Sequence, residues 1–345
     1  MNTPRVTFRT VKCKEVREYP NNPRENSGAV EYVANSIEEF GFKRPLVVDE
    51  ELVLLAGHTR LLALRRLGVE EVTVAVVEGL DEAQKTAYRI KDNRAGELTL
   101  FDFDKVAEEI LSFAGGIDMT RFGFEPVKVA PPRGGPLGCG GRRGCGRLRG
   151  LPQVRKGGGM MEMQGMKIET RALDSLKEYP NNARKITDKA VEYVAQSIRE
   201  VGFLNPLVVT ADGEIVCGHV SARAARAAGL KEVPCVVADD LTEEQIKAFR
   251  LADNKTAAMA IWNPEKLAEE MAKLAGTQFT MEGMGFDEEM LGAVGGDLQT
   301  GVDNGVDNSG EGGAAVKDTS GELDLDGEFG DDAFQHVCPH CGLKF

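Results

Sequence analysis

The stretch AVEYVANSIEEFGFKRPLVV (Ala29–Val48) decides the fold, because it returns almost unchanged as AVEYVAQSIREVGFLNPLVV (Ala190–Val209). The two stretches are identical at 15 of 20 positions, at an offset of 161 residues. The correspondence starts at EYPNN (Glu18–Asn22 and Glu178–Asn182) and continues for about 110 residues in each copy, a normal length for one domain. A repeat of that length predicts tandem domains and not a solenoid.

The order of secondary-structure elements follows from the pattern within each copy. Apolar residues recur at helical spacing in Val30–Phe40, and Gly41 then ends the helix. PLVV and the apolar run after it predict two short strands, a second helix covers Arg60–Leu67, and another strand covers Val72–Val77. With two further helices, each copy is predicted to be a small α+β domain with a short mixed sheet flanked by helices. Capping residues mark three further helix starts: Leu80-Asp81-Glu82, Leu241-Thr242-Glu243 and Asn263-Pro264.

Composition separates the repeated domains from two segments of opposite charge. Lys128–Gly159 carries eight Lys or Arg and no acid in a Gly/Pro-rich sequence, which predicts a flexible basic tether able to hold a nucleic-acid backbone. Asp287–Gln335 carries fourteen acidic residues and one lysine, which is typical of a disordered, solubilising tail; mimicry of nucleic acid is the alternative. The predicted divisions are domain copy 1 at 1–127, linker at 128–165, copy 2 at 166–286, tail at 287–335 and a cysteine-containing end at 336–345.

The overall composition excludes several classes of protein. The 345 residues are 42% hydrophobic and 28% charged, with a net charge of −13, which is ordinary for a soluble globular protein. No apolar run approaches about 18 residues and no charged-then-apolar leader is present, so neither a membrane span nor a secretory signal is predicted. The seven scattered cysteines do not indicate a disulfide framework. We therefore expect a cytoplasmic protein.

The strongest candidate site is the turn Gly57-His58-Thr59-Arg60, at a strand-to-helix junction. Glycine lets a ligand approach the backbone, the helix N-terminus offers free amides to an anion, and arginine can bind phosphate through two parallel hydrogen bonds. This pattern indicates phosphate binding. The alternative is that the glycine only makes the turn, His58 caps it and Arg60 is a surface charge.

Taken together, the motifs resemble the N-terminal domain of the ParB/Spo0J partition family, which shares its fold with sulfiredoxin. Asn22-Pro23-Arg24 is similar to the first box of that family, and the helix, glycine and Pro-Leu-Val-Val segment is similar to its next signature. AGHTRLLALRRLG (Ala56–Gly68) stands where the family has a Gly-Glu-Arg-Arg type box, and Asp92-Asn93-Arg94 stands at its acidic-Asn pair. The resemblance covers roughly two-thirds of the chain. It implies two tandem ParB/sulfiredoxin-like domains of the phage or mobile-element type.

The resemblance also implies a nucleotide site. The cofactor would be a nucleoside triphosphate, CTP as in partition members or ATP as in relatives that transfer phosphate, bound with Mg²⁺. The implied phosphate-binding residues of copy 1 are Gly57, His58, Thr59 and Arg60, assisted by Arg24, with Asp92 and Asn93 near the nucleotide and its metal ion. The implied residues of copy 2 are Arg184, Gly218, His219, Arg223, Asp253 and Asn254. Two departures are that His58-Thr59 replaces the family's Glu-Arg and that no helix-turn-helix domain follows either copy.

Copy 2 departs further from the family pattern than copy 1. Val220-Ser221 replaces Thr59-Arg60, so the position best suited to bind phosphate has lost its charge. Arg223 is the next arginine and could reach the site from a neighbouring turn. We therefore expect copy 1 to be the competent nucleotide site and copy 2 to be a structural or regulatory partner.

A separate metal site is indicated at the C-terminal end, where Cys338-Pro-His-Cys341-Gly follows His336. This spacing is half of a zinc knuckle, and structural zinc normally takes four ligands, so Cys338, Cys341 and His336 would need one more. The alternative is an unstructured end with two reactive thiols.

Three functions remain open from the sequence. The first is a ParB-like, nucleotide-binding, DNA-associated protein of a phage or mobile element, acting in partition, packaging or DNA modification. Its partners would be DNA, bound directly or through another protein, a DNA methyltransferase or packaging protein, and a second copy of itself. The second is a nucleotide-dependent phosphotransferase or nuclease on the same fold, with Arg60 on the phosphates and Asp92 on the metal. The third is an interaction scaffold in which both pockets are vestigial. The sequence contains no independent catalytic motif, and it leaves open whether the protein hydrolyses CTP or ATP.

Overall fold

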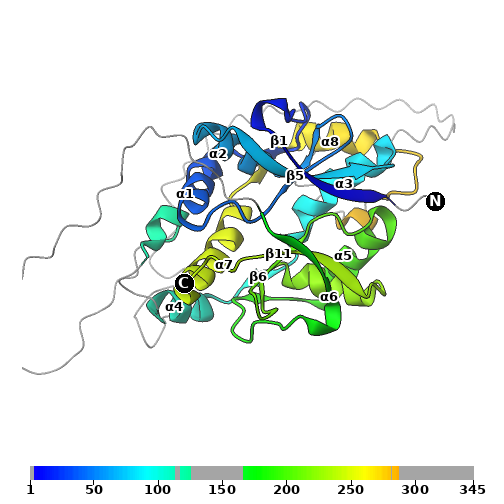
Figure 1. Ribbon diagram of the computed structural model, residues 1–345. Helices are drawn as coiled ribbons and strands as arrows, with labels where there is room; N and C mark the ends of the chain where they lie inside the picture. The colour runs from blue at the N-terminus through cyan, green and yellow to red at the C-terminus, as the bar shows by residue number, and fades with distance from the viewer. Residues whose placement is uncertain (1–3, 113–116, 126–165, 281, 287–345) are drawn as a thin grey trace, which may run out of the picture. The chain divides into compact units, whose positions relative to one another are not determined.

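The computed structural model describes residues 4–112, 117–125, 166–280 and 282–286 (Figure 1). The described residues of both copies belong to one compact unit. The elements of copy 1 are β1 (Arg5–Lys12), η1 (Cys13–Glu15), β2 (Arg24–Glu25), η2 (Ser27–Ala29), α1 (Val30–Phe40), β3 (Leu46–Val48), β4 (Leu54–Ala56), α2 (His58–Arg66), β5 (Glu71–Glu78), α3 (Glu82–Ala95), β6 (Leu100–Phe101), α4 (Phe103–Ser112) and η3 (Met119–Phe122). Copy 1 therefore contains the predicted order of helices and strands.

The same order returns in copy 2. Its elements are β7 (Ile168–Ala172), η4 (Leu173–Ser175), β8 (Arg184–Lys185), α5 (Asp188–Val201), β9 (Leu207–Val209), β10 (Ile215–Cys217), α6 (His219–Ala227), β11 (Glu232–Val237), α7 (Glu243–Ala257), β12 (Ile261–Trp262), α8 (Pro264–Ala272) and η5 (Glu282–Met284). The predicted fold class, two copies of a small α+β domain, is confirmed. Across the described ranges, no helix is long and apolar enough to cross a membrane.

Each copy contains one four-stranded mixed sheet. The strand order is β1-β5-β3-β4 in copy 1 and β7-β11-β9-β10 in copy 2, with the two central strands of each sheet parallel and the outer strands antiparallel. The outer strand β1, which pairs with β5 along its whole length, was missed by the sequence prediction. Its sequence, RVTFRTVK, mixes charged and apolar residues because β1 lies at the edge of the sheet and is largely accessible to water.

One face of each sheet is covered by two helices of the same copy. In copy 1, Leu61 and Leu64 of α2 and Ile37 of α1 pack on Leu46 and Leu54 of the sheet, and all five side chains are buried. Copy 2 repeats this core with α5 and α6. Because the repeated stretch supplies the helix and the central strand of this core, its conservation between the copies follows from packing.

The helices beyond the sheets begin where their capping residues predict. Asp81 and Thr242 each accept a hydrogen bond from the backbone three residues on, and a glutamine at that position completes a capping box. Asn263 accepts from the backbone of Lys266, and Pro264 occupies the first turn of α8. These predictions are confirmed.

The last strand and helix of each copy pack on the other copy. Strand β6 of copy 1 pairs with β8 of copy 2, and β12 of copy 2 pairs with β2 of copy 1. In Figure 1, α4 lies beside α7, and α8 lies among the elements of copy 1. The apolar contacts agree, because Val106 of α4 clusters with Phe249 of α7, and Leu267 of α8 clusters with Ile90 of α3. We call α4 and α8 the exchanged helices.

Each exchanged helix places one buried glutamate against the other copy. Glu109 of α4 forms an ion pair with Arg250 of α7, with 3.2 Å between Oε1 and Nη1, and both side chains are 1% exposed. The Arg250 guanidinium lies 3.5 Å from the centre of the Tyr179 ring. We call Glu109, Arg250 and Tyr179 the first clasp.

The second clasp is the equivalent group, formed by Glu270, Arg89 and Tyr19. Glu270 of α8 accepts hydrogen bonds from the Tyr19 hydroxyl at 2.8 Å and from Asn21 Nδ2 at 2.7 Å. The Arg89 guanidinium lies 3.7 Å from the centre of the Tyr19 ring. Lys273, one turn on in sequence, forms the ion pair with Glu270 that Arg250 supplies in the first clasp. The first clasp joins the copies through a buried ion pair, and the second joins them through hydrogen bonds from Tyr19 and Asn21 to the buried Glu270.

Candidate functional site

One cavity of about 340 Å³ is lined by residues of both copies. Twelve of the thirteen residues predicted to bind nucleotide line it: Arg24, Gly57, His58, Thr59, Arg60, Asp92, Asn93, Arg184, Gly218, His219, Asp253 and Asn254. Arg223 does not line it; its guanidinium forms an ion pair with Glu178 at 2.6 Å. The structure therefore joins the two predicted sites into one space but does not bring Arg223 to it.

The turn before α2 requires glycine for two reasons. Gly57 has φ of 106°, in the left-handed region that side chains disfavour. A Cβ at this position would also lie 2.9 Å from Leu46 Cδ2 and 3.2 Å from the Arg60 guanidinium. Among the described residues, no side chain caps the N-terminus of α2. The turn thus brings the Arg60 guanidinium against the backbone and leaves the first amides of α2 available to an anion.

Arg60 is a charged group that lacks an acidic partner within the described ranges. Its Nη1 donates to the carbonyl oxygens of Arg44 at 3.0 Å and Pro45 at 2.7 Å. Burial, with the nearby charge of Arg44, lowers the pKa of Arg60 to about 10. The guanidinium is therefore protonated at neutral pH, and two backbone carbonyls hold it in one orientation.

The two residues between Gly57 and Arg60 are polar but uncharged at neutral pH. The Thr59 hydroxyl donates to Asn26 Oδ1 at 3.0 Å. Burial, followed by the charges of Arg89 and Arg60, lowers the pKa of His58 to about 4. Among the described residues, the buried His58 Nε2 has no hydrogen-bond partner. His58 is therefore a neutral group with one nitrogen available to a ligand.

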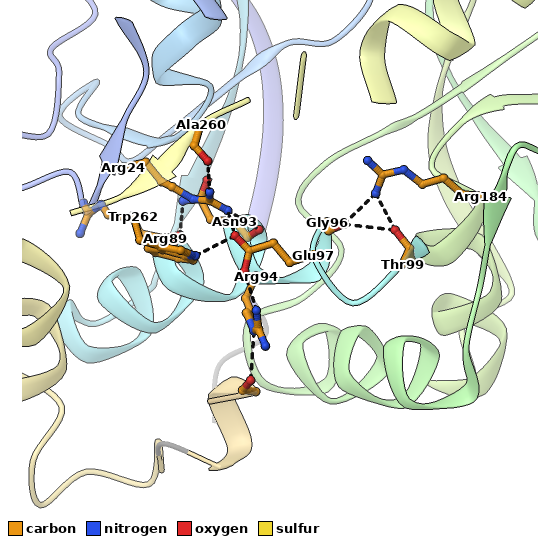
Figure 2. A network of polar contacts seen from close by, with 11 residues as sticks. Arg24, Arg89, Asn93, Arg94, Gly96, Glu97, Thr99, Arg184, Ala260 and Trp262 are labelled. Atoms are coloured by element: carbon orange, nitrogen blue, oxygen red, sulfur yellow. Dashed lines mark hydrogen bonds and ion pairs between the residues drawn. The ribbon is translucent and has the colours of Figure 1, made fainter. Parts of the chain in front are cut away.

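Arg24 and Arg184 stabilise the two places where a strand of one copy pairs with a strand of the other, β2 with β12 and β8 with β6 (Figure 2). Figure 2 shows Arg24 between the carbonyl oxygens of Asn93, in its own copy, and Ala260, in the other copy. The Arg24 guanidinium also pairs with Glu97 and lies 4.1 Å from the centre of the Trp262 ring. These contacts connect β2 to the exchanged strand β12.

Arg184 repeats this arrangement with fewer charges. Its Nη1 donates to the Gly96 carbonyl at 2.7 Å and to Thr99 Oγ1 (Figure 2). Its Nη2 donates to the Asn254 carbonyl at 2.9 Å. Within the described ranges, the buried Nε atoms of both Arg184 and Arg24 lack a hydrogen-bond partner. Both arginines therefore act first as connectors between the copies; their assistance to phosphate binding stays a prediction.

The aspartate of each acidic-Asn pair, Asp92 in copy 1 and Asp253 in copy 2, contacts a residue of the other copy. Asp253 accepts from Arg44 Nη1, at 3.1 and 3.2 Å from its two oxygens. Asp92 accepts from Asn205 Nδ2 at 2.7 Å, and burial raises the pKa of Asp92 while Arg44 and Arg60 lower it. Asn205 occupies in copy 2 the position of Arg44 in copy 1. One carboxylate thus faces a cation and the other an amide.

The copy 2 half of the cavity has fewer polar and charged groups than the copy 1 half, and the differences fall on residues that contact each other in copy 1. Thr59 and Asn26, which hydrogen-bond to each other, correspond to the apolar Val220 and Ile186. Likewise, the two connected arginines Arg60 and Arg44 of copy 1 correspond to the uncharged Ser221 and Asn205. The two halves of the cavity therefore differ at several contacting positions and not at Arg60 alone.

Sequence reasoning missed Arg44, Asn205 and the two clasps. Arg44 and Asn205 lie within the quoted repeat, at one of its five differing positions, so their difference was visible. Their partners Asp92 and Asp253 were predicted, but for a role at the nucleotide. The clasp glutamates stand at equivalent places in the repeated Ala-Glu-Glu of the last helices, a signal that amphipathic periodicity alone assigns to the surface.

The predicted zinc ligands Cys338, Cys341 and His336 lie outside the described residues. Among the residues that the structure describes, no group of three or more His, Cys, Asp or Glu is arranged to hold a metal ion. The zinc site stays a prediction.

Comparison with known proteins identifies the repeated domain. The sequence profile of the ParB N-terminal domain matches residues 2–94 and 160–255, more than half of the chain. The ParB-like nuclease domain-containing protein YnaK of Escherichia coli is 36% identical over 80 residues, which is 23% of this chain and 92% of that protein. The chromosome-partitioning protein Spo0J of Thermus thermophilus is 36% identical over 99 residues, 28% of this chain and 36% of that protein.

A solved structure of the chromosome-partitioning protein ParB of Caulobacter crescentus, complexed with CTP-γ-S, is 26% identical. It matches 37% of this chain and 70% of that chain with a TM-score of 0.29. This chain spans little more than a third of the Spo0J relative, so it shares the N-terminal part of partition proteins and not their whole length. Because the family profile matches both copies, the chain belongs to the ParB N-terminal domain family and carries that domain twice.

Proposed function

We propose that the shared cavity binds one nucleoside triphosphate, CTP or ATP, through the Gly57–Arg60 turn of copy 1. The observation that carries this proposal is Arg60, a positively charged guanidinium fixed by two carbonyls beside the uncapped start of α2. A phosphate there would meet a guanidinium and helix amides together, the two groups that proteins combine for phosphate. The half contributed by copy 2 has no equivalent cation, since Ser221 stands at the position of Arg60.

The remaining residues of the cavity fit the rest of a nucleotide. His58 Nε2 and Arg24 Nε are buried polar atoms without a partner among the described residues, and a ligand would satisfy them. Asp92 offers carboxylate oxygens of the kind that Mg²⁺ takes beside nucleotide phosphates. In this proposal copy 2 supplies the opposite wall and regulates the site.

We infer further that the chain is a DNA-associated protein of a phage or mobile element, with a role in partition, packaging or DNA modification. Its chromosome-partitioning relatives support the association with DNA, and the basic Lys128–Gly159 segment offers charge for a phosphate backbone. A DNA methyltransferase or packaging protein would be a partner. The division into two domains, linker, tail and metal-binding end at the positions given above is part of the same proposal.

A second candidate function is nucleotide-dependent phosphotransfer or nuclease activity. The name of the relative YnaK, which refers to a nuclease domain, favours it, since that protein matches over 92% of its own length. In this case Arg60 would bind the phosphates and Asp92 a metal ion.

The test is binding of CTP, ATP and ADP, with and without Mg²⁺, to the full chain by calorimetry. Arg60→Ala should weaken binding by about tenfold to a hundredfold, the size of losing a charge-assisted hydrogen bond. Arg66→Ala is the matched control, because Arg66 lies on the same helix, is exposed, and is absent from the cavity wall. Equal affinity of wild type and Arg60→Ala would remove Arg60 from the site.

Turnover assays then separate the functions. Nucleotide hydrolysis stimulated by DNA supports the DNA-associated protein. Phosphate transfer to another acceptor, or cleavage of DNA, supports the second candidate. Failure to bind any nucleotide supports the scaffold hypothesis.

A further inference from the structure

The ion pair between Arg44 and Asp253 joins the two copies inside the cavity. Arg44 immediately precedes Pro45 and β3 in copy 1, and Asp253 lies in α7 of copy 2. Arg44 Nη1 lies 3.1 and 3.2 Å from the two Asp253 oxygens, and both residues line the cavity. A single guanidinium nitrogen therefore meets both oxygens of the carboxylate. The Asp253 carboxylate therefore accepts hydrogen bonds from the Arg44 guanidinium that an anionic ligand would otherwise accept.

This ion pair lies next to the proposed phosphate site. The carbonyl oxygen of Arg44 accepts a hydrogen bond from Arg60 Nη1 at 3.0 Å, so the two arginines are directly connected. The charge of Arg44 lowers the pKa of Arg60, whereas the charges of Asp92 and Asp253 raise it. Asp253 is therefore close enough to act on Arg60 electrostatically. A phosphate at Arg60 would meet the repulsion of the same carboxylate.

The equivalent contact in the other direction, between Asp92 and Asn205, is not an ion pair. At the equivalent place, Asp92 of copy 1 accepts from the side-chain amide of Asn205, which carries no charge. Copy 2 thus places a carboxylate on a cation of copy 1, whereas copy 1 places a carboxylate on an amide of copy 2. Of these two equivalent contacts, only the one made by copy 2 is an ion pair, although the charge of Asp92 in copy 1 also acts on Arg60.

We propose that Asp253 is an internal competitor for the phosphate site of copy 1, so that copy 2 sets the affinity of copy 1 for nucleoside polyphosphates. This proposal rests on the nucleotide site proposed above and adds its regulation. A bound polyphosphate displaces Asp253 from Arg44, and the freed guanidinium joins Arg60 on the ligand. The cross-copy contact would therefore loosen when ligand binds.

Asp253→Asn tests this proposal while keeping the shape of the side chain. Its remaining oxygen can still accept a hydrogen bond from Arg44, but the competing charge is gone. The affinity for CTP or ATP should rise by about tenfold, which equals about 1.4 kcal/mol. Inorganic triphosphate should gain by a similar factor, because the competition concerns phosphate and not the base. Asp253→Ser provides a second variant without the charge.

Glu178→Gln is the matched control, because it removes one negative charge of copy 2 at an ion pair outside the cavity. The affinity of Glu178→Gln for CTP or ATP should equal that of the wild type. Binding is measured with and without Mg²⁺, since an Asp253 that ligates the metal predicts the opposite sign: weaker binding of the variant when Mg²⁺ is present. That result, or an affinity unchanged in both Asp253 variants, would overturn the proposal.

The outcome also separates this proposal from the nucleotide site itself. If the wild type binds nucleotide and both Asp253 variants bind no more tightly, only the competition fails. If neither the wild type nor any folded Asp253 variant binds, the nucleotide site and the competition fail together. If only the Asp253 variants bind measurably, both proposals are supported.

Discussion

In copy 1 the turn that starts α2 carries Thr59 and Arg60, whereas the same turn of copy 2 carries Val220 and Ser221. The backbone of the two turns is the same, with a left-handed glycine before each helix at φ of 106° and 99°. The two turns therefore share a backbone and differ in the chemistry that they bring to the cavity. Packing explains why the glycine of each turn is shared, whereas the side chains that follow it differ in charge and polarity.

The clasps differ in a similar way. Arg250 and Glu109 are both almost inaccessible to water, whereas Lys273, which pairs with Glu270, has a side chain that is 49% exposed. The ion pair of the first clasp is therefore more deeply buried than that of the second clasp, although Arg250 also pairs with Glu214. This comparison gives the largest expected effect on stability.

Glu109→Gln should destabilise the chain more than Glu270→Gln. Removing one partner of a buried ion pair costs about 3–5 kcal/mol, and the buried Arg250 would then keep only the partly exposed Glu214, at 3.1 Å, as its acidic partner. Glu270→Gln should cost about 1–3 kcal/mol, since its cation is partly hydrated and an amide keeps some of the hydrogen bonds. Equilibrium urea unfolding of both variants measures the difference. Equal losses would mean that the two clasps are energetically equivalent.

The next effect is on the pH dependence of stability. Burial, followed by the Arg250 charge, lowers the pKa of His219 to about 4, and His58 behaves alike. The unfolded chain binds these protons near pH 6.5 and the folded chain does not, so their stabilising contribution is full above pH 6.5 and is lost toward pH 4. At pH 5 the loss for the buried His219 is about 2 kcal/mol.

His219→Gln isolates this contribution from the titrating carboxylates. The unfolding free energy of wild type and variant, measured from pH 7.5 to 4.5, should converge as the pH falls. His58→Gln should show the same convergence, because both histidines are held neutral. Parallel curves for either variant would show that the histidine concerned has the same pKa in the folded and the unfolded chain.

The smallest expected effects are those of replacing the glycine in either of the two turns, Gly57 or Gly218. Gly57→Ala and Gly218→Ala should each cost about 1–2 kcal/mol of stability, because alanine disfavours positive φ. Only Gly57→Ala pushes on a guanidinium, since its Cβ would lie 3.2 Å from Arg60, whereas a Cβ at Gly218 meets Leu207. Nucleotide affinity should fall about tenfold in Gly57→Ala, equal to about 1.4 kcal/mol, and stay unchanged in Gly218→Ala. A reversed order would place the competent site in copy 2.

Local sequence signals predicted most of the elements. The helix stop at Gly41, the caps at Asp81, Thr242 and Asn263, and the turn at Gly57 are properties of a few neighbouring residues, and the structure agrees with each. Twelve of the thirteen residues predicted to bind nucleotide line one cavity, although the sequence predicted two separate sites, and their role in binding stays a prediction.

The exchange of α4 and α8 could not be predicted in the same way. It depends on the two-residue strands β6 and β12, which are too short to show a periodic pattern and pair with residues far away in the chain. The Arg44–Asp253 ion pair depends in turn on the exchange, because its partners are separated by 209 residues. A periodic pattern specifies which residues form an element but not which copy that element joins.

The most direct test of the account is the stoichiometry of nucleotide binding to the full chain, measured by calorimetry with CTP and ATP. We expect one nucleotide per chain, bound with an affinity that falls in Arg60→Ala and is unchanged in Ser221→Ala. Two nucleotides per chain, or one nucleotide whose affinity depends on Ser221 and not on Arg60, would contradict a single site built on copy 1.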